Sequence, residues 1–201
     1  MGKIIGITGG IASGKSTVTT YLRQQGFQVV DADRLVHQLQ KPDGRLYQVL
    51  VQHFGQEIIL ENRELNRPLL ASLIFSNPEE REWSKQTQGE IILEELAALR
   101  DQLAQTEAIF FMDIPLLFEQ GYANWFDETW LIYVDYDVQL ERFMKRNHLS
   151  KEVAESRLAA QWSLEEKKKL ASHILDNNGS RDQLVSQVVK LLEGGDSCAR
   201  D

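Results

Sequence analysis

The chain alternates short apolar runs with longer segments in which apolar residues recur at helical spacing. Short runs rich in β-branched and aromatic residues are typical of buried strands. Strands that alternate with helices indicate a parallel sheet covered on both faces. We therefore expect an α/β fold, a three-layer sandwich around a mostly five-stranded parallel sheet. The predicted strands are "KIIGIT" (3–8), "FQVVDAD" (27–33), "AIFFMD" (108–113), "ETWLIYVD" (128–135) and "HILDNNG" (173–179), which ends in a turn.

Capping signals mark the ends of several predicted helices. Asn77 precedes Pro78 and two glutamates, as at a helix N-terminus. Ser150 caps another helix, and Ser163 and Ser180 are each followed three residues later by Glu or Gln, the pattern of a capping box. The predicted helices are 15–25, 34–40, 45–55, 66–75, 77–105, 136–147, 151–161, 164–171 and 180–193.

One loop carries a specific chemical signal. "GGIASGKS" (9–16) fits G-x-x-x-x-G-K-[ST] between a predicted strand and a predicted helix, the context that the motif requires. Glycines let backbone N–H groups converge on an anion, and the helix N-terminus adds partial positive charge. A glycine-rich turn that binds nothing would not need the lysine and hydroxyl. We expect a P-loop kinase-type fold whose ATP contacts come from Gly9, Gly10, Ile11, Ala12, Ser13, Gly14, Lys15, Ser16 and Thr17.

The residues of this loop have separate expected roles. Lys15 reaches the β- and γ-phosphates, Ser16 binds Mg²⁺, and Thr17 lies near the α-phosphate.

Acidic residues end two predicted strands, at the sheet edge where ligands of open α/β sheets bind. Asp33 is a candidate general base, and Asp113 is a candidate Mg²⁺ ligand and substrate contact. The alternative for each acid, including Asp31, is a helix N-cap. Two such acids beside a phosphate loop favour the functional interpretation.

Arg142 and Arg146 lie four residues apart on one predicted helix, and Arg157 is on the next. A solvated face is the alternative, but arginines on a closing lid would stabilise a transferring phosphoryl group and exclude water. We expect such a lid at about 147–169, with "KKK" (167–169) on its solvated face. Of the four histidines, which lack metal-ligand spacing, only His37 is assigned a substrate contact.

Composition limits the class of protein. The 201 residues carry a formal net charge of −8, which argues against nucleic acid as a partner and requires the cations for any anionic ligand to be concentrated locally. Cys198 is the only cysteine, so no intramolecular disulfide forms. No signal peptide or membrane-spanning run is apparent, and no obligate protein partner is indicated. We expect a cytoplasmic protein.

Together these motifs resemble the dephospho-coenzyme A kinase family over nearly the full length. The resemblance depends on "IGITGGIASGKSTV" (5–18), "VVDADRLVHQ" (29–38), "LNRPLLASLIF" (65–75), "DIPLLFE" (113–119), the arginines of "ERFMKR" (141–146), "SRLAAQ" (156–161) and "DNNG" (176–179). It implies ATP-dependent phosphorylation of the ribose 3′-hydroxyl of dephospho-coenzyme A, the final step of coenzyme A synthesis.

The resemblance also implies residue roles and regions. Asp33 is the base on the 3′-hydroxyl, Arg142 contacts ATP phosphates, and Asn178 lies near adenine. The regions implied within one domain are a core (1–40, 106–140, 172–193), a helical substrate region (41–105), the lid and a flexible tail (194–201). The acceptor region includes Pro115, Leu116, Leu117 and Glu119.

The chain departs from the family pattern at three places. Ala12 stands where a glycine is frequent, a change that a backbone with a negative φ tolerates, and we expect it to keep such a φ. Gly89 and Glu90 stand where a His-Pro pair is frequent, so that histidine's role cannot be transferred. Leu164 and Lys167 stand where lid arginines are frequent, and a lysine lacks the bidentate fork of arginine.

Three alternatives remain at this point. A nucleoside or nucleotide kinase would differ in acceptor preference. A GTPase switch would need an N-K-x-D guanine-binding motif, which the chain lacks. A non-catalytic ATP-dependent scaffold would not need Asp33.

Overall fold

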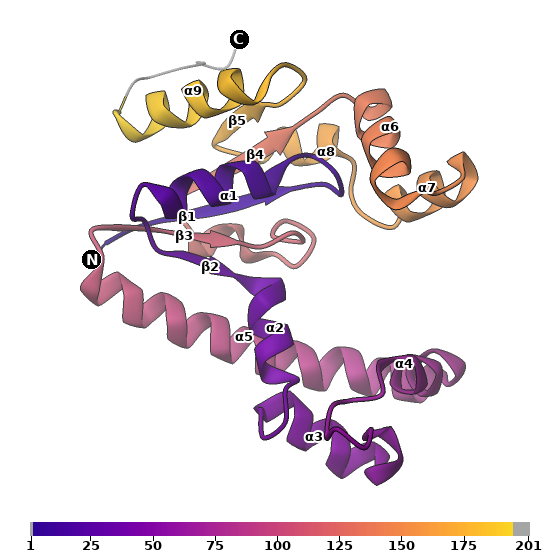
Figure 1. Cartoon of the computed structure of the whole chain (residues 1–201). Helices are drawn as coiled ribbons and strands as arrows, with labels where there is room; N and C mark the ends of the chain where they lie inside the picture. The colour runs from indigo at the N-terminus through magenta and orange to yellow at the C-terminus, as the bar shows by residue number, and fades with distance from the viewer. Residues whose placement is uncertain (1, 195–201) are drawn as a thin grey trace. The chain divides into compact units, whose positions relative to one another are not determined.

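A five-stranded parallel sheet organises the part of the chain that contains the phosphate loop (Figure 1). This computed structural model describes residues 2–194, so the predicted tail beyond Gly194, with Cys198, lies outside the described residues. The strand order is β2-β3-β1-β4-β5, which places the strand before the phosphate loop in the middle. The strands are β1 (Lys3–Gly9), β2 (Val29–Asp31), β3 (Ile109–Asp113), β4 (Glu128–Tyr133) and β5 (His173–Asp176).

The helices confirm the predicted alternation, with ends that differ by a few residues. The long helix predicted at 77–105 is α5 (Pro78–Thr106), and Gly89 lies inside it. Two short 3₁₀ helices, η1 (Gln56–Ile58) and η2 (Tyr122–Trp125), were not predicted. The other helices are α1 (Lys15–Gln24), α2 (Ala32–Leu39), α3 (Arg45–Phe54), α4 (Arg67–Ser76), α6 (Tyr136–Asn147), α7 (Lys151–Leu158), α8 (Leu164–Lys168) and α9 (Arg181–Leu192).

The predicted strand 27–33 is too long at its C-terminal end. The Asp31 side chain accepts a hydrogen bond from the backbone N–H of Arg34 at 2.9 Å, so α2 begins at Ala32. Asp31 is therefore the N-cap. Asp33 lies in the first turn of α2 rather than at the end of a strand.

Contacts within the chain divide it into two compact units. Among the described residues, the first contains 2–30 and 103–194, and the second contains Asp31–Gln102. The first unit holds the sheet and the phosphate loop, and the second holds α2, α3, α4 and most of α5.

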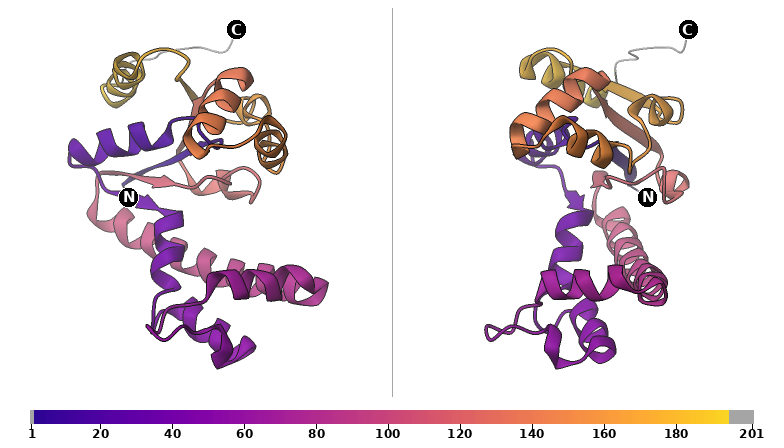
Figure 2. Two further views of the ribbon diagram at one scale, coloured as in Figure 1. Left: turned by 45° about the vertical axis from the view of Figure 1, so that its right-hand side comes forward. Right: turned by 90° about the vertical axis from the view of Figure 1, so that its right-hand side faces the viewer.

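The core of the first unit lies between one face of the sheet and helices α1 and α9 (Figure 2). Alternate residues of β1, Ile5 and Ile7, point into it, as the period of two in a strand requires. They pack against Val18 and Leu22 of α1, four residues apart on one helix face. This packing fixes the start of α1, and hence the loop before it, at the carboxyl end of β1.

The second unit has its own smaller core. Tyr47 and Leu50 of α3 pack with Ile58, Leu65 and Leu70, and Trp83 of α5 lies against them.

No helix among residues 2–194 is long and apolar enough to cross a membrane.

The capping box at the N-terminus of α9 predicts a measurable contribution of Ser180 to stability. Ser180 Oγ accepts from the Gln183 N–H at 3.3 Å, and Gln183 Oε1 accepts from the Ser180 N–H at 2.8 Å. Ser180→Ala should lower the free energy of unfolding by about 1 kcal/mol, because an N-terminal N–H loses its acceptor. Ser186→Ala is the matched control, since Ser186 Oγ only donates to the Asp182 carbonyl within the helix. Urea unfolding of both variants measures this; equal stabilities would contradict the predicted capping contribution.

Candidate active site

The phosphate loop requires glycine at position 14 for two separate reasons. Gly14 has φ of 96°, in the left-handed region that side chains other than hydrogen disfavour. A Cβ at this position would also lie 2.1 Å from Asn177 Nδ2. Lys15 follows as the first residue of α1, so the backbone N–H groups of the helix start face the end of the loop.

Ala12 contradicts the expectation of a negative φ. Its φ is 59°, so it adopts the left-handed conformation that glycine adopts without strain. The expectation of a negative φ was wrong, because it followed the usual preference of alanine, whereas the turn of the loop has a positive φ at this position. Ala12 packs beside Ile11 against the cluster formed by Leu140, Phe143 and Ala154.

Two side-chain amides from later segments hold the loop in shape. Asn177 Nδ2 donates to the Ser13 carbonyl at 2.8 Å, and Gln139 Nε2 donates to the Ile11 carbonyl at 2.8 Å. Both amide side chains are buried. Neither residue was predicted from the sequence, which offered only the second position of "DNNG" as a signal for Asn177.

Lys15 and Asp113 form the central ion pair of the site. Lys15 Nζ lies 2.5 Å from Asp113 Oδ1, and the two side chains are only 17% and 10% exposed. Asp113 is the last residue of β3, next to β1 in the sheet. No helix begins after Asp113, so the alternative N-cap interpretation is wrong for this acid. The structure thus brings a predicted phosphate-binding cation and a predicted magnesium ligand together.

The arginines of α6 divide into two environments. Arg142 is half-buried, and its Nη1 donates to the Asn177 carbonyl at 2.9 Å, which links α6 to the segment that holds the loop. Arg146 is exposed; its Nε donates to Asn147 Oδ1 at 2.9 Å. The side chain of Asn178, whose place near adenine stays a prediction, accepts from the Asp135 N–H at 2.9 Å.

A buried lysine organises the segment that follows β3. Lys167 of α8 is fully buried; its Nζ lies 2.7 Å from Glu119 Oε1 and donates to the Pro115 carbonyl at 3.1 Å. The same carbonyl accepts from Thr8 Oγ1 at 3.1 Å, and Glu119 Oε1 accepts from the Trp162 N–H at 3.2 Å. The expectation that 167–169 forms a solvated face is therefore wrong for Lys167, because "EEKKK" gives no local sign of a buried charge.

Asp33 and His37, which were predicted to contact the substrate, both lie on α2 in the second unit. Asp33 is exposed in the first turn of α2. His37, on the same helix, has its Nδ1 3.2 Å from Nη2 of Arg67.

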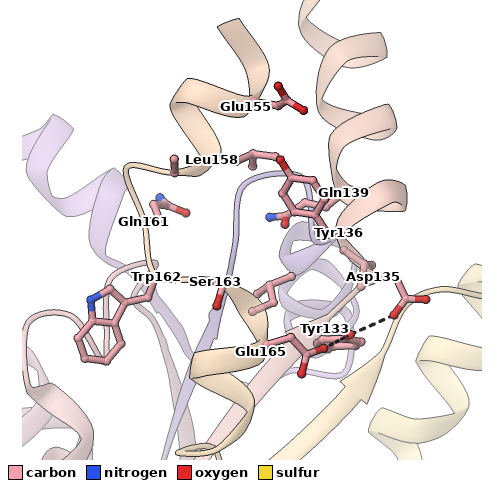
Figure 3. A pocket seen from close by; sticks show the side chains of 13 residues that line it. Tyr133, Asp135, Tyr136, Gln139, Glu155, Leu158, Gln161, Trp162, Ser163 and Glu165 are labelled. Atoms are coloured by element: carbon pink, nitrogen blue, oxygen red, sulfur yellow. Dashed lines mark hydrogen bonds between the residues drawn. The ribbon is translucent and has the colours of Figure 1, made fainter. Parts of the chain in front are cut away.

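A cavity of about 250 Å³ opens at the carboxyl end of β4 between α6, α7 and α8 (Figure 3). The Tyr133 hydroxyl donates to the carboxylates of Asp135 and Glu165. The hydrogen bond to Glu165, together with burial, raises the pKa of Tyr133 above its ordinary value, so the hydroxyl stays protonated. Gln139 lines this cavity while it holds the phosphate loop.

Comparison with known proteins decides the family. The family model described as dephospho-CoA kinase matches residues 3–183. The chain belongs to the dephospho-CoA kinase family. A dephospho-CoA kinase of Streptococcus pneumoniae serotype 4 is 78% identical over 201 residues, all of both chains.

Solved structures agree with this family assignment. The dephospho-CoA kinase of Campylobacter jejuni has a TM-score of 0.74 at 28% identity and covers 96% of this chain and 99% of its own. TT1252 from Thermus thermophilus has a TM-score of 0.76 at 34% identity, covering 96% of this chain and 97% of its own.

The chain is thus a dephospho-CoA kinase. It transfers a phosphoryl group from ATP to the ribose 3′-hydroxyl of dephospho-coenzyme A, which completes coenzyme A synthesis. The resemblance inferred from the sequence motifs is confirmed.

Removal of the buried lysine should destabilise this kinase strongly. Lys167→Ala would leave Glu119, only 14% exposed, without its counter-charge, and Glu119 Oε2 has no hydrogen-bond partner among the described residues. The expected loss is about 3–5 kcal/mol of unfolding free energy. Lys169→Ala, at an exposed position two residues later, should change it by less than about 0.5 kcal/mol. Equal denaturant midpoints for the two variants would contradict the structural role of Lys167.

Substitution of Ala12, the loop residue with a left-handed φ, should increase the free energy of unfolding rather than lower it. Ala12→Gly should stabilise the protein by about 0.5–1 kcal/mol, because relief of the left-handed strain exceeds the entropy cost of glycine. Ala159→Gly, at φ of −65°, should instead destabilise it by about 0.5–1 kcal/mol. Thermal unfolding of the pair measures the difference, and a loss of stability in both variants would refute the strain at Ala12.

Proposed function

We propose that the phosphate loop and the Lys15–Asp113 pair form the donor site of this kinase. The observation that carries the proposal is the 2.5 Å contact between an ammonium and a carboxylate at the N-terminus of α1, both largely buried. The loop amides from Gly9 to Thr17 would surround the triphosphate of ATP, and Lys15 would donate to its β- and γ-phosphates. The positive end of α1 favours the same anion.

The donor atoms near this pair suit a magnesium ion. Mg²⁺ prefers oxygen ligands and is usually held by one or two protein groups together with phosphates and water. Ser16, exposed in the first turn of α1, and Asp113 would hold it. When bound, Mg²⁺ neutralises charge on the β- and γ-phosphates.

Asp33 takes the proton of the acceptor hydroxyl in this proposal. Its carboxylate is exposed, and the capping role that would otherwise explain an acid at this position belongs to Asp31. As the ribose 3′-oxygen forms a bond to the γ-phosphorus, its proton passes to Asp33 and the bond to the β–γ bridging oxygen breaks, which releases ADP.

The remaining predicted residues have supporting roles. Arg142, held at the Asn177 carbonyl, and Arg146 would stabilise charge on the transferring phosphoryl group, with the segment 147–169 closing as a lid. Asn178 would lie near adenine. On the acceptor side, His37 and Asp113 would contact substrate with Pro115, Leu116, Leu117 and Glu119, a segment that Lys167 holds in place. A cytoplasmic location is part of the same proposal.

Substitution of Asp33 tests its role as a base. Asp33→Asn should lower kcat by about 10²–10⁴-fold with little change in the KM for ATP, since the amide cannot accept the proton. Asp31→Asn is the matched control, because asparagine caps helices as well as aspartate does. Steady-state kinetics with dephospho-coenzyme A measure both variants. An equal loss of turnover and ATP affinity in Asp33→Asn would remove its assignment as the base.

A further inference from the structure

Asn177 is buried in a turn whose other residues are partly or fully exposed. It follows β5 directly and is only 8% exposed, whereas Asp176, Gly179 and Ser180 are exposed. Its backbone N–H donates to the Tyr133 carbonyl at 2.8 Å, which continues the parallel pairing of β4 and β5 by one residue. Asn177 is therefore fixed at the carboxyl end of the sheet, where ligands of open α/β sheets bind.

The side-chain amide of Asn177 holds one peptide group of the phosphate loop. Its Nδ2 donates to the Ser13 carbonyl at 2.8 Å, across 164 residues of sequence. The peptide between Ser13 and Gly14 is planar and trans, so its N–H points away from the side on which its carbonyl lies. The contact with Asn177 therefore fixes the direction of the Gly14 N–H as well.

The Gly14 N–H is a donor at a place that a ligand can reach. Among residues 2–194 it has no hydrogen-bond acceptor, and Gly14 is partly exposed whereas Ser13 is buried. A backbone N–H that loses water on binding costs free energy unless the ligand accepts from it. Because Gly14 is the N-cap of α1, this N–H is one of the donors that a helix N-terminus presents to an anion.

A cation is held at the backbone of the same residue. The Asn177 carbonyl accepts from Arg142 Nη1 at 2.9 Å. A carbonyl orients the guanidinium without balancing its charge, and among residues 2–194 no carboxylate lies within ion-pair distance of Arg142. Asn177 thus connects a peptide of the phosphate loop with an arginine whose charge is uncompensated.

The segment that carries Asn177 is itself anchored on both sides. Before it, Gln187 Oε1 of α9 accepts from the Asp176 N–H at 2.9 Å, and Gln187 Nε2 donates to the Asp176 carbonyl at 2.8 Å. After it, Asn178 Oδ1 accepts from the Asp135 N–H at 2.9 Å. A donor that is oriented before the ligand arrives needs no reorganisation when charge develops in the reaction.

We propose that Asn177 is a positioning residue for phosphoryl transfer: its side-chain amide orients the Ser13–Gly14 peptide so that the Gly14 N–H donates to the phosphates of ATP. This inference rests on the donor site proposed above. It assigns the Asn177 side chain to the phosphate end of the nucleotide, whereas its neighbour Asn178 is the residue predicted near adenine.

Asn177→Ala tests the proposal, with Gln187→Ala as the matched control. Loss of the amide frees the loop peptide, so kcat/KM for ATP should fall by about 10- to 100-fold while the KM for dephospho-coenzyme A stays near that of the wild type. Gln187→Ala removes two hydrogen bonds from the neighbouring Asp176, so it should lower the thermal midpoint without changing either constant. An equal loss of kcat/KM in both variants would overturn the inference, because general loosening of the segment would then be the cause.

Asn177→Leu separates hydrogen bonding from packing. Leucine has nearly the shape of asparagine but donates no side-chain hydrogen bond, so this variant should lose as much kcat/KM for ATP as Asn177→Ala. Wild-type activity in Asn177→Leu would overturn the inference, since the volume of the side chain would then be sufficient. Circular dichroism verifies that each variant is folded.

Calorimetric titration with inorganic tripolyphosphate isolates the loop from the base and from turnover. Tripolyphosphate has the phosphates of ATP without adenosine, so Asn177→Ala should weaken its binding to the full chain by the same factor as that of ATP. An unchanged affinity for tripolyphosphate would overturn the inference. Lys15→Ala tests the donor site itself: wild-type ATP binding in that variant would remove the proposed donor site, whereas weaker binding in Lys15→Ala with unchanged binding in Asn177→Ala would remove only the inference.

Discussion

The phosphate loop depends on contacts between its backbone carbonyls and side-chain amides from distant parts of the chain. Asn177 binds the Ser13 carbonyl, and Gln139 binds the Ile11 carbonyl. Because the carbonyl groups of Ser13 and Ile11 accept these hydrogen bonds, they are held by the protein, and N–H groups of the loop can converge on an anion. The close approach of Asn177 also excludes any side chain at Gly14. The loop that we propose as the donor site is therefore shaped by side chains of α6 and of the segment after β5.

Two ion pairs of the first unit, Lys15–Asp113 and Lys167–Glu119, have different roles. Lys15 and Asp113 lie at the carboxyl end of the sheet, where the triphosphate of the proposed donor site would compete for the ammonium. Lys167 is fully buried and is held by Glu119 and the Pro115 carbonyl, so it fixes the backbone after β3. Burial makes the second pair costly to break, because either charge alone would remain in a medium of low dielectric constant. The segment 113–119 therefore contains both Asp113, which pairs with the lysine of the phosphate loop, and Glu119, which pairs with the buried structural lysine.

The sequence alone determined the features that depend on neighbouring residues. The five strands, the helix ends at Ser150, Ser163 and Ser180, the loop from Gly9 to Ser16 and the family follow from short motifs and periodicity, which need only a few adjacent residues to act. Tertiary structure alone decided the left-handed φ of Ala12, the burial of Lys167, and the contact of Asn177 with the loop. It also joined Lys15 to Asp113, 98 residues later. The physical reason is that burial, charge pairing and imposed backbone conformation arise from contacts between segments far apart in the chain, and no local pattern records them.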